Sequence, residues 1–197
     1  MLFDAVFDMD PRIAKSVEPY VVEHDDAGAN DGMVTIGVHM RHKNGQDDGH
    51  DVHKYVTCLD QMLEFYPTQP CTVYIASDRP RAVAAFAREA RNRNCTAVFV
   101  NHDAEARDMD HLKNELSDDK EHGVFAGLPY FKDLHLLSHQ SRSGLIHSGG
   151  NSWTGSSASA LIWQQLVYNG IQDGSFSYPP MDCSPTLKRV RFHGPTP

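Results

Sequence analysis

The sequence has little of several features that would assign a function directly. It has no excess of positive charge, because 18 Lys and Arg stand against 26 Asp and Glu, for a formal net charge of −8. Nucleic-acid backbones are bound by clustered cations, so this balance argues against a nucleic-acid partner. No apolar run approaches the roughly 20 residues of a membrane-spanning helix. The first residues, MLFDAVFDMD, are too acidic for a signal peptide, so we expect a cytosolic chain or a targeting segment outside it.

Three common site motifs are also absent. The four cysteines are scattered and form no CxxC pair, which argues against a zinc knuckle and leaves the disulfide state open. No GxGxxG follows the first expected strand, and no GxxxxGK[ST] occurs anywhere. A dinucleotide-dependent dehydrogenase and a P-loop NTPase are therefore both disfavoured.

What is present is a regular alternation of apolar patterns. Short runs rich in apolar and β-branched residues predict buried strands, and helical spacing of apolar residues follows each of them. The strands are expected near 33–38, 71–76, 97–100 and 144–147. Helices are expected from Val52 to about Tyr66, around Val83–Ala90, over 129–140 and around 158–167. This order predicts an α/β fold with a Rossmann-like parallel sheet and helices on both faces.

The chain divides into three parts by composition. Residues 1–32 are expected to hold a helix that starts at Asp10-Pro11 and then a polar loop. Residues 33–170 form the predicted Rossmann-like domain. Residues 171–197 are rich in proline and show little periodicity, so we expect an irregular C-terminal tail there.

The stretch 147–170 reads as a strand end, a loop of small polar residues, and a helix entered through Ser156 and Ser157. The first turn of a helix has unpaired N–H groups and a partial positive charge, which suits a phosphate. The alternative interpretation is an ordinary strand-to-helix connection with serine capping, since Ser is a favoured N-cap.

Polar side chains follow three of the expected strands. In an open parallel sheet, ligands bind beyond the carboxyl ends of the strands. A cation, a carboxylate and a helix N-terminus at that edge would suit a sugar nucleotide. Arg41 would hold phosphate, Asp78 would accept hydrogen bonds from ribose or base, and the two serines would bind diphosphate oxygens. The candidate residues for binding this sugar nucleotide are His39, Arg41, Ser77, Asp78, His147, Ser156 and Ser157.

Each of these residues also has a structural interpretation. Arg41 could form a salt bridge, His39 could be packed at a strand end, and Asp78 could serve only to start a helix. The pairs His50/His53 and His135/His139 have helical spacings that can place two imidazoles together. Neither pair has a third ligand beside it, so we expect no metal site.

Three segments of the sequence, IGVHMRH (36–42), VYIASDRP (73–80) and KDLHLLSHQS (132–141), together resemble the α-1,6-fucosyltransferases and the related protein O-fucosyltransferases. IGVHMRH (36–42) resembles the family's IGVHVRR, with the shared HxR motif, and VYIASDRP (73–80) is similar to VYLATDDP. KDLHLLSHQS (132–141), followed by a strand and a Ser-Ser element, is similar to DIHFLSQA and the element after it. The three segments keep their order over about residues 33–168.

The resemblance implies a GT-B glycosyltransferase that transfers fucose from GDP-fucose with inversion and without a metal. It implies Arg41 as a catalytic residue and a catalytic carboxylate in the loop holding Asp47 and Asp48, which would take the acceptor's proton. The sequence departs from the pattern at His42, where the family has a second Arg, and at Asn44, where it has Asp. Only the donor-binding half of a GT-B enzyme is visible in the chain.

The function expected from the sequence is therefore fucosyl transfer to a hydroxyl of a glycan or glycoprotein, with a nucleotide sugar as donor and no separate cofactor. The resemblance would place such a glycosylation enzyme in the Golgi or ER lumen. The first alternative is a non-catalytic nucleotide- or sugar-binding domain, either a fragment or an inactive relative. The second is a flavodoxin-like interaction domain. Binding of GDP and GDP-fucose separates the three.

Overall fold

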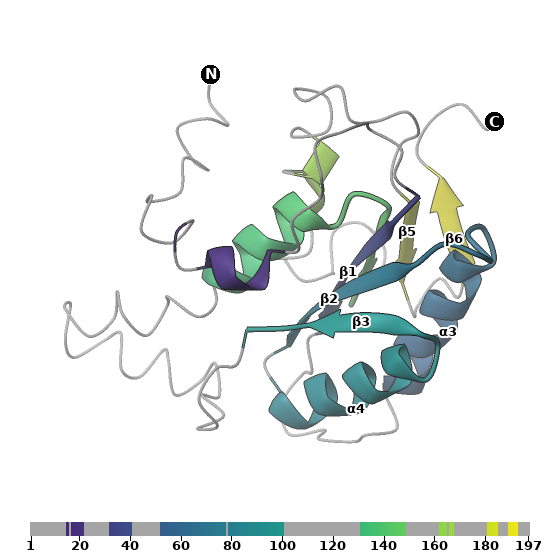
Figure 1. The fold of residues 1–197 in the computed structure, drawn as a ribbon, viewed down its shortest axis with the longest axis horizontal. Helices are drawn as coiled ribbons and strands as arrows, with labels where there is room; N and C mark the ends of the chain where they lie inside the picture. Colours follow the sequence, from purple (N-terminus) through teal and green to yellow (C-terminus); the bar gives the residue numbers. More distant parts are fainter. Residues whose placement is uncertain are drawn as a thin grey trace.

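A six-stranded sheet forms the centre of the molecule (Figure 1). The computed structural model describes residues 15, 17–21, 32–40, 52–77, 79–100, 131–148, 162–164, 166–167, 181–184 and 189–192. The strands are β1 (Val34–Met40), β2 (Cys71–Ser77), β3 (Cys95–Val98), β4 (Gly144–His147), β5 (Met181–Ser184) and β6 (Arg189–Phe192). Their order across the sheet is β3-β2-β1-β4-β5-β6.

The first five strands are parallel, which confirms the predicted α/β, Rossmann-like fold. β1 lies at the centre and pairs with β2 on one side and with β4 on the other, both in parallel. β3 and β5 extend the sheet in parallel, and β6 pairs antiparallel with β5 at the edge. Every residue of β1 is buried, as expected for a strand covered on both faces.

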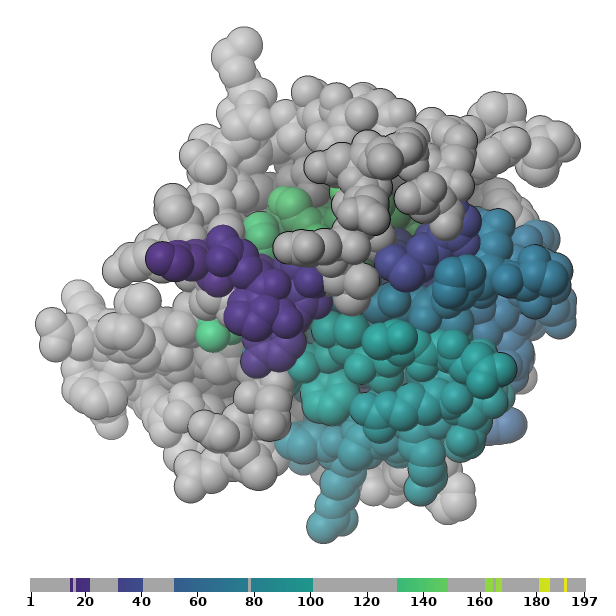
Figure 2. Space-filling view, viewed as in Figure 1, coloured from purple at the N-terminus to yellow at the C-terminus, as the bar shows by residue number. Residues whose placement is uncertain are grey.

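One face of the sheet is covered by α3 (Val52–Leu63) and α4 (Pro80–Arg91), and we call it the α3/α4 face (Figure 1). Apolar residues at helical spacing along α3 turn towards the strands, as the sequence pattern predicted. They pack with Ile36, Val38 and Val73 from the central strands in one large apolar cluster. In Figure 2 the teal atoms of α4 and β3 form one continuous part of the surface.

The opposite face is covered mainly by the helix of residues 131–140, and we call it the 131–140 face. Leu134, Leu136 and Leu137 pack there with Tyr74 of β2 and Leu145 of β4. Residues 162–164 and 166–167 are also helical, and the short 3₁₀ helix η1 (Glu18–Tyr20) lies near the start of the described chain. Helices on both faces are what the alternating pattern predicted.

All four cysteines are paired in disulfides on the α3/α4 face. Cys58 of α3 is bonded to Cys183 of β5, and Cys71 of β2 to Cys95 of β3. The four residues belong to the same apolar cluster as the core of that face. One disulfide therefore fixes a helix to the sheet, and the other joins two neighbouring strands where they begin.

The observed strands differ from the predicted ones at two places. The third strand begins at Cys95, because Cys95 pairs with Cys71 and the chain turns at Asn94 with a positive φ of 60°. The expectation of an irregular tail after residue 171 is wrong for β5 and β6, which complete the sheet. Their four-residue length carries too few apolar positions for a periodic signal.

Within the described residues, no helix is long and apolar enough to cross a membrane.

Candidate functional site

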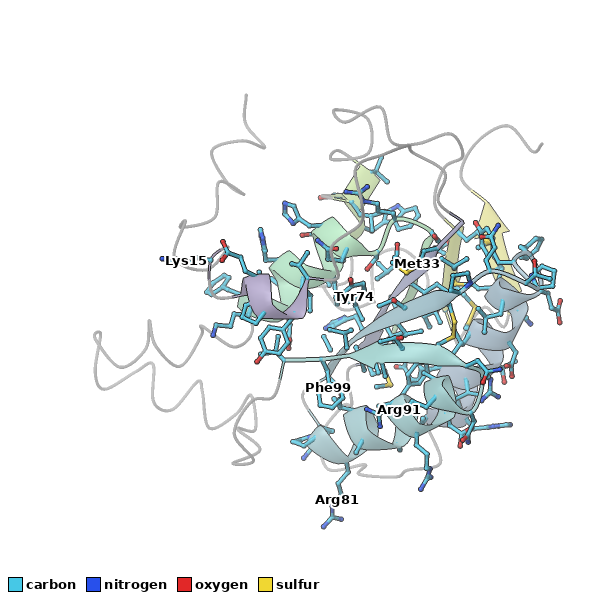
Figure 3. All side chains as sticks on the ribbon, viewed as in Figure 1. Lys15, Met33, Tyr74, Arg81, Arg91 and Phe99 are labelled. Carbon is cyan, nitrogen blue, oxygen red and sulfur yellow. A yellow bond between two sulfur atoms is a disulfide. The ribbon has the colours of Figure 1, made fainter. Side chains whose placement is uncertain are left out.

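The carboxyl ends of β1 and β4 lie where the strand order of the sheet reverses. From β1 the chain moves outwards to β2 and β3 on one side, and it returns to β4 and β5 on the other. Ligands of open parallel sheets bind beyond the strand ends at such a point. In Figure 3, Met33 ahead of β1 and Phe99 after β3 mark the amino and carboxyl edges of the sheet.

Two histidines occupy this point. His39 and His147 are register partners at the ends of β1 and β4. Register partners of parallel strands point to the same face, and adjacent strands lie about 4.8 Å apart. Gly37 and Leu145, two positions earlier, are also partners and belong to the 131–140 face. The two imidazoles therefore project side by side on that face, at the carboxyl edge.

His39 is the more enclosed of the two, with 7% of its surface exposed. Its backbone carbonyl accepts a hydrogen bond from the N–H of Ser148 at 3.0 Å. This bond holds the first residue after β4 against the end of β1. The positions of the two histidines are thus fixed by the sheet and by the connection that leaves it.

His147 is bound to a buried carboxylate. Its Nε2 lies 3.1 Å from Oδ2 of Asp182 on β5, and the Asp182 side chain is only 3% exposed. Asp182 is the register partner of Leu145, so it points to the same face as both histidines. The other ring nitrogen of His147, Nδ1, is buried and has no hydrogen-bond partner within the described part of the chain. The ring as a whole keeps 16% of its side-chain surface exposed.

Ser77 reaches the same edge on the other face. It is the register partner of Met40, whose side chain belongs to the α3/α4 cluster. The Ser77 hydroxyl accepts a hydrogen bond from the N–H of Arg79 at 3.2 Å, directly before Pro80 opens α4. The structure therefore places Ser77 at the helix start and does not bring it together with the two histidines.

The remaining candidate residues from the sequence lie outside the described part of the chain. They are the cation Arg41, the carboxylates Asp47, Asp48 and Asp78, and the serines Ser156 and Ser157. Their convergence on the carboxyl edge stays a prediction.

The sequence interpretation missed Asp182 because it lies in the part expected to be irregular. The four residues of β5 do alternate, with Met181 and Cys183 on the α3/α4 face and Asp182 opposite. That alternation is the signal that could have shown a strand with polar residues on one face. It is too short to stand out after a proline pair.

A second pair of histidines lies on the helix 131–140. The rings of His135 and His139 are 4.0 Å apart, and Nδ1 of His139 is 2.9 Å from the carbonyl oxygen of His135. Burial, and then the nearby His139, lower the pKa of His135 to about 4. Among the residues that the structure describes, no group of three or more His, Cys, Asp or Glu side chains is arranged to hold a metal.

Comparison of the sequence with protein-family models finds no match, and comparison with curated proteins finds none either.

Proposed function

We propose that this chain is the donor-binding half of a fucosyltransferase-like glycosyltransferase that transfers fucose from GDP-fucose to a glycan or protein hydroxyl. The proposal combines the motif resemblance of the sequence with the position of the histidine of HxR in the fold. Transfer would proceed with inversion at the anomeric carbon and without a metal.

The observation that carries the proposal is the pairing of His39 with His147 at the strand-order reversal. Both residues were predicted as donor-binding candidates, and His39 belongs to the HxR segment of the resemblance. They are separated by more than a hundred residues in the sequence, yet they lie at the one place where a parallel sheet of this order binds its ligand. An interaction domain of the flavodoxin class would not require these residue types there.

The chain order also accounts for how a diphosphate would be held. Arg41 directly follows β1 and lies two positions after His39. The serine-rich connection begins directly after His147, the last residue of β4. A guanidinium and a helix N-terminus stabilise the negative charge that develops on a departing diphosphate. Stabilising that charge is where such a site would gain most of its rate.

Calorimetric titration of the full chain with GDP, GDP-fucose and UDP tests the proposal. We expect GDP and GDP-fucose to bind and UDP to bind at least about tenfold more weakly, because a guanine site would leave polar groups unpaired with uracil. Release of GDP from GDP-fucose, followed by chromatography, reports catalysis.

Three outcomes separate the candidate functions. Binding together with GDP release supports the transferase. Binding without release supports a nucleotide-sugar-binding domain. A chain that binds neither GDP nor GDP-fucose is neither of these, and the proposal is then wrong.

A further inference from the structure

The pair His147–Asp182 is not explained by donor binding alone. Asp182 comes from β5, outside all three segments that resemble the fucosyltransferases, and its carboxylate is buried. A buried carboxylate is costly unless it is hydrogen-bonded. The protein has placed it against a histidine at the ligand-binding edge of the sheet.

The carboxylate determines which nitrogen of His147 carries the proton. A carboxylate only accepts hydrogen bonds, so Nε2–H of His147 donates to Oδ2 of Asp182 at 3.1 Å. In the neutral ring, Nδ1 is then the unprotonated acceptor nitrogen. That nitrogen is buried and has no hydrogen-bond partner among the residues that the structure describes. Buried polar atoms are nearly always hydrogen-bonded, which marks Nδ1 as the atom that a ligand would contact.

We propose that His147 is the general base of the transfer reaction, with Asp182 as its positioning residue; this rests on the proposed function. A nucleophile, a base and a group that orients the base form the usual arrangement for activating a hydroxyl. Here Asp182 orients the ring and stabilises the imidazolium that forms. Nδ1 receives the proton of a hydroxyl-bearing acceptor.

The step is balanced in atoms and charge. The acceptor's O–H bond breaks and its proton moves to Nδ1 of His147. The oxygen's electron pair forms the new bond to the anomeric carbon of fucose. The bond from that carbon to the diphosphate oxygen breaks, and its electron pair leaves with GDP. Asp182 keeps its hydrogen bond to Nε2 throughout and takes no proton.

This assignment differs from the base expected from the sequence. The resemblance implied a carboxylate in the loop of Asp47 and Asp48, whereas the described geometry offers an imidazole on β4. His39, its neighbour, reaches the same face and edge. The His147 side chain is 16% exposed, so an acceptor can reach the ring, and Nδ1, which is buried in the free chain, would become accessible when the ligand binds.

The test measures donor affinity and turnover separately on His147→Gln and Asp182→Asn. GDP release from saturating GDP-fucose, with water as the acceptor, should fall at least about 100-fold in His147→Gln because proton removal is lost. Asp182→Asn should lower it by about 10-fold or more, because the ring loses the carboxylate that fixes its tautomer and orientation. GDP-fucose affinity should change by less than about twofold in both variants, because the lost interaction acts only in the reaction step.

Matched controls come from the α3/α4 side of the chain. His53 and Asp60 are exposed on α3, so His53→Gln and Asp60→Asn make the same chemical changes away from the site. Melting temperatures of all four variants report folding. Both control variants should retain wild-type turnover.

A second measurement does not depend on activity. In the chain with ¹⁵N-labelled histidine, His147 is assigned as the ring signal missing from His147→Gln. It should show a protonated Nε2 and an unprotonated Nδ1, and Asp182→Asn should move the proton partly to Nδ1. A wild-type ring protonated on Nδ1 alone would overturn the base role.

The outcomes distinguish the two proposals. A wild-type chain without donor binding overturns the proposed function, and the role of His147 falls with it. A chain that binds GDP-fucose but releases no GDP overturns the base role and leaves donor binding in place. If the wild-type chain is active and His147→Gln retains its turnover, the base role alone is overturned. The same holds if donor affinity falls in His147→Gln by the same factor as turnover.

Discussion

The two faces of the sheet differ in what they bury. The α3/α4 face buries aliphatic and aromatic side chains and both disulfides. The 131–140 face also has an apolar cluster, but among the described residues it adds His39, Asp182 and Thr35 to its buried groups. One face therefore mainly stabilises the fold, and the other carries the groups able to do chemistry.

The difference follows from the alternation of side chains along each strand. In β5, Cys183 points to α3 and the preceding Asp182 points to His147. In β1, Met40 and Val38 enter the apolar cluster, and His39 between them enters the polar site. When one face of a strand is fixed by packing, the backbone positions of the residues on its other face are fixed as well. The packing of the α3/α4 face therefore helps to hold His39 and Asp182 in position.

Removing the disulfide Cys58–Cys183 should have the largest effect on stability. It closes a loop of 125 residues, so in the loop-entropy model its loss destabilises the chain by about 5 kcal/mol. The disulfide Cys71–Cys95 spans 24 residues and should contribute about 3 kcal/mol. Denaturant unfolding of Cys58→Ala/Cys183→Ala and Cys71→Ala/Cys95→Ala measures the two losses. A larger loss for the shorter loop would contradict the ranking.

Truncating Arg41 should affect the ligand and not the fold. Arg41→Ala should weaken GDP binding by about 2–4 kcal/mol if the guanidinium holds phosphate through two charge-assisted hydrogen bonds. Arg41→Lys should recover only part of this, because an ammonium keeps the charge but loses the planar fork. GDP affinity and melting temperature are measured on both variants.

Arg93→Ala is the matched control on the α3/α4 side, because Arg93 forms ion pairs with Asp60 and Glu89. It should lower the melting temperature slightly and leave GDP affinity unchanged. The same pattern in Arg41→Ala would mean that Arg41 forms a structural salt bridge.

Gly37 lets the 131–140 face close against the sheet. A Cβ at this position would lie 2.0 Å from Oγ and 2.8 Å from Cβ of Ser141, which follows the helix. Gly37→Ala should therefore destabilise the fold by about 1–3 kcal/mol through overpacking. Adding Ser141→Gly removes both contacts and should restore part of the loss, as measured by denaturant unfolding. An unchanged stability in Gly37→Ala would show that the helix end moves freely.

The sequence was most informative where long apolar patterns occur. The burial of Val52, Tyr55 and Leu59 on α3 follows their spacing, and β1, β2 and β4 follow from apolar runs. His39 and His147 were predicted as binding candidates because each stands at the end of such a run.

The rest depended on contacts between distant residues. Four cysteines allow three pairings, and their spacing does not choose between them. The partner of His147 lies 35 residues away on a strand too short to give a periodic signal. The sequence predicted the edge of the sheet at which Ser77 lies. The face to which its side chain points depends on the register with Met40, and the sequence alone does not give that register.

The last effect concerns pH, and it should distinguish the two faces. Burial and the neighbouring His139 lower the pKa of His135 on the 131–140 face from 6.5 to about 4. The unfolded chain therefore binds a proton near pH 6.5 that the folded chain excludes until about pH 4. Protonation in this window favours unfolding, so stability should fall as the pH is lowered through it.

His135→Gln removes this titrating group and should make the free energy of unfolding less sensitive to acidification between pH 7 and 4.5. His53→Gln, on the exposed side of α3, is the matched control and should retain the wild-type acid sensitivity. Urea unfolding across this range measures both variants, and a ¹⁵N histidine titration reads the pKa of His135 directly. An ordinary pKa for His135 would contradict the prediction, and so would equal acid sensitivity in the two variants. Either result would show that burial and His139 do not lower the pKa of His135.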